Sequence, residues 1–269
     1  MSKRQILNLT STKKRDTMLS WTQDKTGKDV ATGAVVNTKA GNGGPVSIFM
    51  WCPTARNMLN TTATGEARGN AGDSATRTSS TPFMRGLKEN IVFYGPGPGS
   101  WEWRRIIFRM RGPATDPRFN VWLRGTQGIS RYWKELTGTA AGAAESLTAI
   151  RDNLFAGQIG LDWNDYQTAP TDNKILDIVY DKKSILQPNN ADEISRRFNQ
   201  WIPMNKTLMY DDDENGGVEG SNPFSAPGKR GMGDMYILDF FSPGPQASTS
   251  TTVTGLNVYA TSTLYWHEK

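Results

Sequence analysis

Apolar and polar residues alternate along several segments of the chain, most clearly over residues 256–266. Leu256, Val258, Ala260, Leu264 and Trp266 share one parity, and Asn, Tyr and Thr occupy the positions between them. Because successive side chains of a strand point to opposite faces, this period of two predicts a half-buried β-strand. Similar patterns predict strands at 15–22, 46–52, 101–110, 174–180 and 235–241.

Two other segments have the spacing typical of helices. In 143–155, Leu147, Ile150 and Leu154 recur with a helical period among good helix formers. In 190–199, Asn190 is a candidate N-cap, and Ile194 and Phe198 are spaced by four. Neither segment alternates with strands as a βαβ fold requires.

Turn-forming clusters rich in Gly and Pro separate the predicted strands at 41–45, 95–99, 112–113 and 243–245. No internal repeat and no shift in composition indicates a second domain. The pattern predicts an all-β fold, an antiparallel sandwich with long loops and one or two short helices. We expect the loops 53–82, 112–135 and 211–230 to be buried against neighbouring subunits.

The composition excludes several classes of protein. Aromatic residues make up 10% of the 269 residues, so the chain is not disordered throughout. One cysteine and one histidine exclude an internal disulfide, a thiol-based zinc site and a histidine cluster within one chain. No apolar run approaches the roughly 18 residues of a membrane span, so we expect no membrane partner.

Candidate catalytic residues are scarce. Cys52 ends the apolar segment 48–52, where we expect a buried, inert thiol, and His267 is the only histidine that could serve it as a base. The chain contains no G-x-S-x-G motif or P-loop, and prolines between Gly95, Gly97 and Gly99 remove donors that a phosphate cradle needs. No pair of carboxylates stands out among the 26 acidic residues. We therefore expect a protein that is not an enzyme and needs no cofactor.

An acidic run, Asp211, Asp212, Asp213 and Glu214, precedes Asn215-Gly216-Gly217. Clustered carboxylates in a Gly-rich loop could bind a hard cation such as calcium. The spacing does not match the D-x-D-x-D-G calcium loop, so we expect no metal site and a solvated surface turn. A cation shared between subunits, or a contact with a neighbour's Lys or Arg, stays open as an alternative.

The net charge of +5 resides in the first fifteen residues, which contain five basic residues and no acid, whereas 16–269 hold 31 − 5 = 26 basic and 26 acidic residues. The basic residues are Lys3, Arg4, Lys13, Lys14 and Arg15. We expect residues 1–15 to form an arm that binds nucleic-acid phosphates and 16–269 to form a single domain. A frayed terminus that aids solubility is the alternative. The triplet 13–15 is also typical of a nuclear-import signal.

Trp101 and Trp103 are interleaved with Arg104 and Arg105, which combines aromatic rings that stack on bases with cations that contact phosphates. These four residues are a second candidate nucleic-acid surface. The alternative is a sandwich strand whose Trp residues lie in the core and whose Arg residues pair with acids. Trp133 in the segment 131–134 raises the same question.

Several segments, in order from residue 13 to about residue 240, resemble capsid proteins of the genomoviruses. These are small circular single-stranded DNA viruses whose shells are related to those of geminiviruses. The matching segments are KKRDTMLS at 13–20, FMWCPTAR at 49–56, WRRI at 103–106, NKTL at 205–208, YDDDE at 210–214 and GMGDMY at 231–236.

The resemblance implies an eight-stranded antiparallel jelly roll that assembles into a T=1-like icosahedral shell of about sixty copies around a single-stranded DNA genome. It also implies location in the virion and the host nucleus, with host nuclear-import factors as further partners. About sixty copies at +5 supply only ~300 positive charges against ~1,000 phosphates of even a small genome. Family members usually carry a longer Arg-rich arm, so we expect either a longer gene product or neutralisation by polyamines and cations.

Two other functions fit an all-β chain of this composition. A carbohydrate-binding jelly-roll lectin would use exposed Trp and Asp with calcium and would remain a monomer or small oligomer. A nonviral single-strand nucleic-acid-binding protein would bind DNA or RNA without forming closed shells. A hydrolase is disfavoured, because the sequence singles out no general base.

Overall fold

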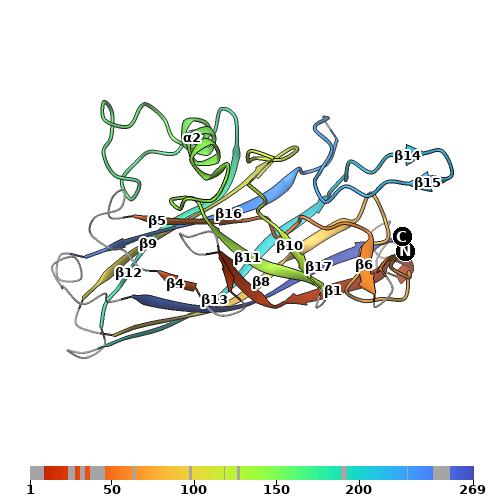
Figure 1. Ribbon diagram of the computed structural model, residues 1–269, viewed down its shortest axis with the longest axis horizontal. Coiled ribbons are helices and arrows are strands. Elements are labelled where there is room, and N and C mark those ends of the chain that lie inside the picture. Colours follow the sequence, from red (N-terminus) through yellow and green to blue (C-terminus); the bar gives the residue numbers. More distant parts are fainter. Residues whose placement is uncertain are drawn as a thin grey trace.

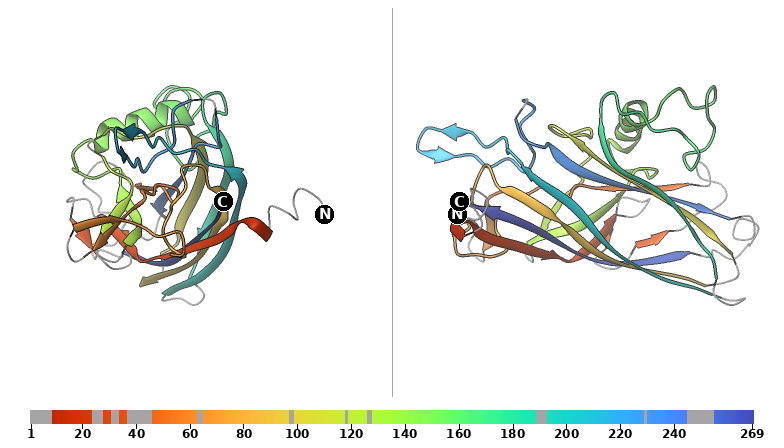
Figure 2. Two further views of the ribbon diagram at one scale, coloured as in Figure 1. Left: turned by 90° about the vertical axis from the view of Figure 1, so that its right-hand side faces the viewer. Right: turned by 180° about the vertical axis from the view of Figure 1, so that it is seen from behind.

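The protein is a β-sandwich in which two sheets face each other (Figures 1 and 2). The computed structural model describes residues 9–23, 28–30, 34–36, 46–62, 65–96, 99–117, 119–125, 128–188, 193–228, 230–244 and 255–269. Within these residues, no helix has the length and apolar character needed to cross a membrane. The predicted turn at 41–45 lies outside the described residues.

The smaller sheet has five strands. Its order is β1 (Thr12–Met18), β17 (Leu256–Glu268), β8 (Phe83–Pro96) and β13 (Glu193–Thr207), and β4 (Ala34–Val36) also pairs with β17.

The larger sheet has eight strands. Its order is β12 (Asp177–Leu186), β9 (Trp101–Met110), β16 (Asp234–Pro243), β5 (Ser47–Trp51), β11 (Gly128–Glu135), β2 (Ser20–Gln23) and β3 (Asp29–Val30), with β10 (Leu123–Gly125) paired to β11. Two hairpins, β6 (Leu59–Thr62) with β7 (Gly65–Arg68) and β14 (Glu214–Asn215) with β15 (Val218–Glu219), lie outside both sheets.

The pairing of the principal strands is jelly-roll-like. In chain order these strands are β1, β5, β8, β9, β12, β13, β16 and β17, and the first pairs with the last, β5 with β16, β8 with β13 and β9 with β12, all antiparallel. This pairing is the one produced when a long hairpin wraps into a sandwich. The all-β sandwich is thus confirmed, although the two sheets together hold more than the eight strands expected for the whole fold, in part because β11 and its parallel partner β2 extend the larger sheet.

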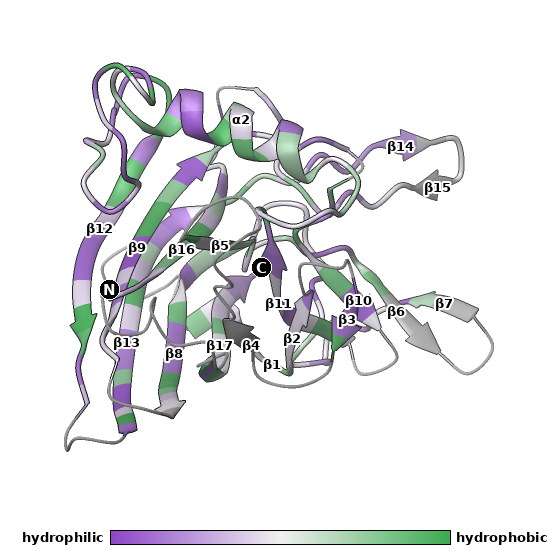
Figure 3. Ribbon diagram, turned by 60° about the vertical axis from the view of Figure 1, so that its left-hand side comes forward, coloured by the Kyte–Doolittle hydropathy of each residue, from purple (hydrophilic) through white to green (hydrophobic). Residues whose placement is uncertain are grey.

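A hydrophobic core fills the space between the sheets, and a second core lies on the other face of the larger sheet. Phe49 and Trp51 of β5 belong to the first core, whereas Ile48 and Met50 belong to the second. The helix α2 (Ala143–Leu154) covers this second core (Figures 1 and 3). The larger sheet is therefore covered on both faces around β5 and β16, whereas the smaller sheet buries one face.

Most predicted strands are confirmed, and their departures have physical reasons. The helix expected at 143–155 is α2, but the helix expected at 190–199 is wrong, because residues 193–199 belong to β13. Ile194 and Phe198 are spaced by four, which keeps them on one face of a helix and equally on one face of a strand. The strand expected at 15–22 divides into β1 and β2 at Leu19, and β12 begins at Asp177 instead of 174.

Five of the expected turns and loops contain strand residues. β8 continues through Pro96, into the cluster expected to form a turn at 95–99, and β16 reaches Pro243. The predicted loop 112–135 contains β10 and β11, and the predicted loops 53–82 and 211–230 each contain a hairpin. These segments pack within the subunit by their own hydrogen bonds, which their Gly, Ser and Thr content does not indicate.

Candidate nucleic-acid interface

The patch predicted on β9 does not lie on the surface. Trp101, Trp103, Arg104 and Arg105 are 2%, 5%, 2% and 1% exposed. Trp103 and Arg105 point between the sheets, where both donate to Asp239 at 2.7 Å. Arg104 points to the opposite face and pairs with Asp181 at 2.7 Å. The prediction of a nucleic-acid surface at these four residues is therefore wrong, and all four lie in the core. Acids on neighbouring strands neutralise the guanidinium groups of Arg104 and Arg105.

A charge-neutral ion network lies inside the sandwich. Glu89 of β8 accepts hydrogen bonds from Arg105 of β9 and from Arg131 of β11, and Arg105 also pairs with Asp239 of β16. Burial opposes the ionisation of Glu89, but the two arginines outweigh it and lower the pKa of Glu89 to about 2. Two cations thus meet two carboxylates. Arg131, which lies in the segment of Trp133, forms its ion pair with Glu89 inside the sandwich. Its charge is therefore not available to a polyanion.

Residues 1–15, here called the basic leader, do not form a free arm over residues 9–15, the part that the structure describes. Strand β1 begins at Thr12 and pairs along β17, so the expected boundary after residue 15 falls inside a strand. Lys14 is buried, with its Nζ 3.2 Å from Glu268 Oε2 and 2.8 Å from the Thr76 carbonyl oxygen. Lys14 therefore cannot contact phosphate in the folded subunit, and residues 13–15 do not present a continuous basic triplet. Lys3 and Arg4 lie outside the described residues.

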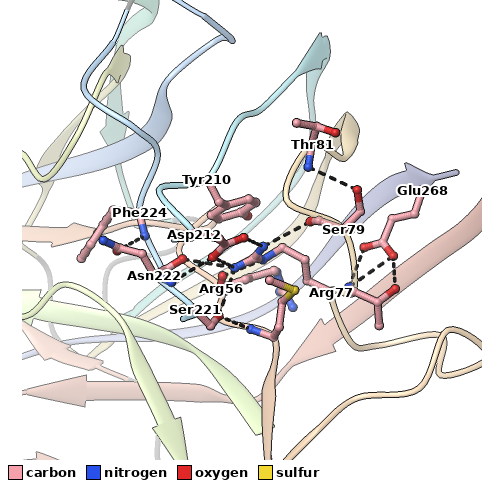
Figure 4. Close-up of polar contacts among 12 residues, drawn as sticks. Arg56, Arg77, Ser79, Thr81, Tyr210, Asp212, Ser221, Asn222, Phe224 and Glu268 are labelled. Atoms are coloured by element: carbon pink, nitrogen blue, oxygen red, sulfur yellow. Dashed lines mark hydrogen bonds and ion pairs between the residues drawn. The ribbon is translucent and has the colours of Figure 1, made fainter. Parts of the chain in front are cut away.

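The acidic run is divided between the interior and the surface. Asp212 is buried and forms a two-bond ion pair with Arg77, at 2.6 Å and 3.0 Å (Figure 4). The Arg77 guanidinium also lies over the Tyr210 ring, 3.7 Å from its centroid. Asp213 and Glu214 are exposed. Among the described residues, no group of three or more His, Cys, Asp or Glu could hold a metal ion.

Cys52 and Asp234 form a buried polar site beside this cluster. Burial first and Asp234 second raise the pKa of the Cys52 thiol well above its usual value. Burial also raises the pKa of Asp234 to about 6, although Ser225 and Thr54 donate hydrogen bonds to its carboxylate. The thiol is buried as expected. A buried thiol that stays protonated is a poor nucleophile.

A different surface collects five of the cations that have no ion-pair partner among the described residues. It is the outward side of β1, β17, β8 and β13, here called the basic face, and in Figure 1 it is the side of the sandwich far from α2. Its cations are Lys13, Arg15, Arg85, Lys88 and Arg197, none of which has an ion-pair partner among the described residues. Glu193, at the first position of β13, is the one acid that shares this side within the described part of these strands.

Strand alternation creates this face. Lys14 and Asp16 take the inward positions of β1, so Lys13 and Arg15 point outward. Lys13 lies opposite His267 of β17, and Arg15 lies opposite Tyr265. Figure 3 shows the same alternation as bands along β8 and β13. The pKa of His267 is lowered by partial burial and then by Arg85 and Lys13, which places both cations close to the imidazole. The imidazole is therefore neutral at pH 7 in a positive environment.

Exposed aromatic rings lie among these cations. The Trp201 indole is 49% exposed, opposite Lys88, with its ring centroid 5.7 Å from that of Tyr265. It lies over Gly86, where an added Cβ would be 2.5 Å from Trp201 Cζ2. Tyr94 and Tyr259, 45% and 51% exposed, form an edge-to-face pair with centroids 6.0 Å apart. The face thus combines cations, which can contact phosphates, with rings on which bases can stack.

Only part of this face could be anticipated. The alternation at 256–266 placed Tyr259 and Tyr265 on the polar side, and the leader supplied Lys13 and Arg15. Arg85, Lys88, Arg197 and Trp201 were missed, because neither β8 nor β13 was predicted and only the pairing of the strands brings them together. The chain matches no protein-family model and no curated protein.

Proposed function

We propose that this protein is the capsid subunit of a small single-stranded DNA virus, and that its basic face lies against the packaged genome. The basic face carries the proposal, because it combines five cations that have no ion-pair partner among the described residues with exposed aromatic rings. The jelly-roll-like strand pairing and the resemblance of six segments to genomovirus capsid proteins support it. The same proposal expects a shell of about sixty copies, located in the virion and the host nucleus.

The aromatic residues favour single-stranded over double-stranded nucleic acid. Tyr94, Trp201 and Tyr259 offer exposed rings beside cations. Unpaired bases can stack on such rings, whereas the bases of a duplex are already stacked on each other. The cations contact phosphates, which every sequence shares, so binding through them is not sequence-specific. Within the leader, Lys13 and Arg15 keep the proposed role, Lys3 and Arg4 retain it as an expectation, and Lys14 loses it.

Electron microscopy of the purified protein tests the assembly. We expect closed particles of uniform size that contain nucleic acid. Dispersed small oligomers that still bind DNA would contradict the capsid and favour the second candidate, a nonviral single-strand-binding protein, because the basic face does not require a shell. Absence of both particles and DNA binding would contradict both functions.

The role of the face is tested with two variants of equal charge change. The face variant Arg15→Gln, Lys88→Gln and Arg197→Gln removes three exposed cations from the basic face. The control variant Lys174→Gln, Lys182→Gln and Lys183→Gln removes three exposed cations elsewhere. We expect the face variant to package less nucleic acid per particle, measured by the ratio of absorbance at nucleic-acid and protein wavelengths. Equal losses in both variants would show that only net charge matters.

A further inference from the structure

A groove of about 600 Å³ crosses the basic face over β17, β8 and β13. This volume is within the range of about 300–1,000 Å³ typical of sites for small molecules. Its lining includes Asn90, Asn199, Arg197, Tyr259 and Thr261. The groove therefore contains a cation, an aromatic ring and uncharged polar groups, but no acid.

Strand register places two carboxamides side by side in this groove. Asn90 of β8 lies opposite Asn199 of β13 and, on its other side, opposite Thr261 of β17. Residues directly opposite on antiparallel strands have Cβ atoms about 4.5–5.5 Å apart. Asn90 and Asn199 are both exposed, and neither side chain has a hydrogen-bond partner among the described residues. Each carboxamide thus presents a free acceptor and two free donors.

The neighbouring row of the sheet supplies the other contacts that a nucleotide needs. Val92 of β8 lies between Arg197 of β13 and Tyr259 of β17. Arg197 can bind a phosphate, and the exposed Tyr259 ring can stack on a base. A base stacked on Tyr259 would lie next to the row formed by Asn90 and Asn199, because the two rows are adjacent along each strand.

We propose that the groove binds one nucleotide of the single strand and that Asn90 and Asn199 recognise its base as adenine. An Asn side chain pairs with adenine through two hydrogen bonds, one donated by the adenine amino group and one accepted by a ring nitrogen. A purine also offers a larger surface for stacking on Tyr259. The inference rests on the proposed function and adds a base preference to a surface that otherwise contacts only phosphates and base faces.

Fluorescence anisotropy tests this preference with a labelled oligothymidylate of about nine nucleotides and the same oligomer with one central adenine. We expect the wild-type protein to bind the adenine-containing oligomer about tenfold more tightly. The double variant Asn90→Ala and Asn199→Ala should lose most of this preference while retaining affinity for the all-thymine oligomer. The control Asn257→Ala, an outward position of β17 outside the groove, should keep the preference.

The possible results separate this inference from the proposed function. Equal wild-type affinity for both oligomers, or an unchanged preference in the double variant, would overturn the adenine site and leave phosphate binding by the basic face intact. Absence of salt-dependent binding of either oligomer would overturn the proposed function itself. Because Asn90 and Asn199 are exposed, a thermal-unfolding curve like that of the wild type is expected to show that the double variant is folded.

Discussion

Glu89 shows how single residues connect the two sheets. Its carboxylate belongs to the smaller sheet, whereas Arg105, Arg131 and Asp239 belong to the larger one. Each charge in this network would be costly to bury alone, since removing one partner of a buried pair leaves the other uncompensated. The network therefore requires the sheets to pack in one relative position, in which every carboxylate meets a guanidinium.

We expect Glu89→Gln to lower the free energy of unfolding by about 3–5 kcal/mol at pH 7, because it leaves Arg105 and Arg131 with one carboxylate. The pKa of Glu89 is lowered from 4.5 to about 2, so its stabilising contribution is present above 4.5 and is lost as the pH falls toward 2. The difference between wild type and variant, measured by urea unfolding, should shrink over that range.

The exposed Glu102 of β9, the next strand along the chain, provides the control. Glu102→Gln should change stability by no more than about 0.5 kcal/mol. A stability difference for Glu89→Gln that stayed constant between pH 7 and pH 3 would show that the loss arises from packing and not from charge.

At the scale of elements, β1 assigns opposite roles to consecutive lysines. Lys13 and Lys14 are adjacent in a basic sequence, and composition treats them alike. The strand directs Lys14 inward to Glu268 and Lys13 outward beside His267. Sequence position alone therefore does not determine which cation stabilises the fold and which is free for a ligand.

The two lysines provide a paired prediction. Lys14→Met should destabilise the protein by about 3 kcal/mol, because Glu268 loses its buried cation, while affinity for single-stranded DNA stays unchanged in the folded variant. Lys13→Met should leave stability within about 0.5 kcal/mol of wild type and weaken DNA binding. Thermal unfolding and anisotropy titration measure the two effects. If Lys14→Met weakened DNA binding as much as Lys13→Met, the inward assignment of Lys14 would be wrong.

A strand could be predicted from the sequence where its apolar residues clearly recurred at every second position. The residues of 256–266 alternate with a single exception, Ser262, and β17 was found within two residues of its end. In β8, by contrast, the charged Glu89 occupies an inward position between Leu87 and Ile91. Such a residue breaks the apolar pattern that indicates a strand. Its partners Arg105 and Arg131 come from other strands, so the compensation for its burial is not readable locally.

The whole molecule has two unlike sides. The larger sheet is covered by α2 and its associated loops, and the smaller sheet presents the basic face (Figure 2). Sequence patterns were enough to predict an all-β sandwich. They did not predict that one sheet is covered and the other is exposed, because that difference depends on which sheet each strand joins. The second candidate surface was misplaced to β9 for the same reason, since a core ion network and a binding surface can contain the same aromatic and cationic residues.

Salt dependence is the prediction that belongs to the whole face. Five free cations should give a plot of log affinity for single-stranded DNA against log salt with a slope of about −3 to −4, at about −0.7 per phosphate contact. The face variant at Arg15, Lys88 and Arg197 should reduce the magnitude of this slope by about 2. The control variant at Lys174, Lys182 and Lys183 should leave it near the wild-type value. A slope near zero in the wild type would contradict phosphate binding by the basic face.

The pairing of the first principal strand with the last has a practical consequence for engineering. Thr12 lies opposite Glu268, so a short linker could join these two strands into a continuous ring. New ends could then be opened at Gly216-Gly217, at the exposed tip of the β14–β15 hairpin, where a Cβ added at either glycine would meet no atom within 4 Å. Such a circular permutant would carry fused cargo or labels at that hairpin, on a part of the subunit separate from both sheets.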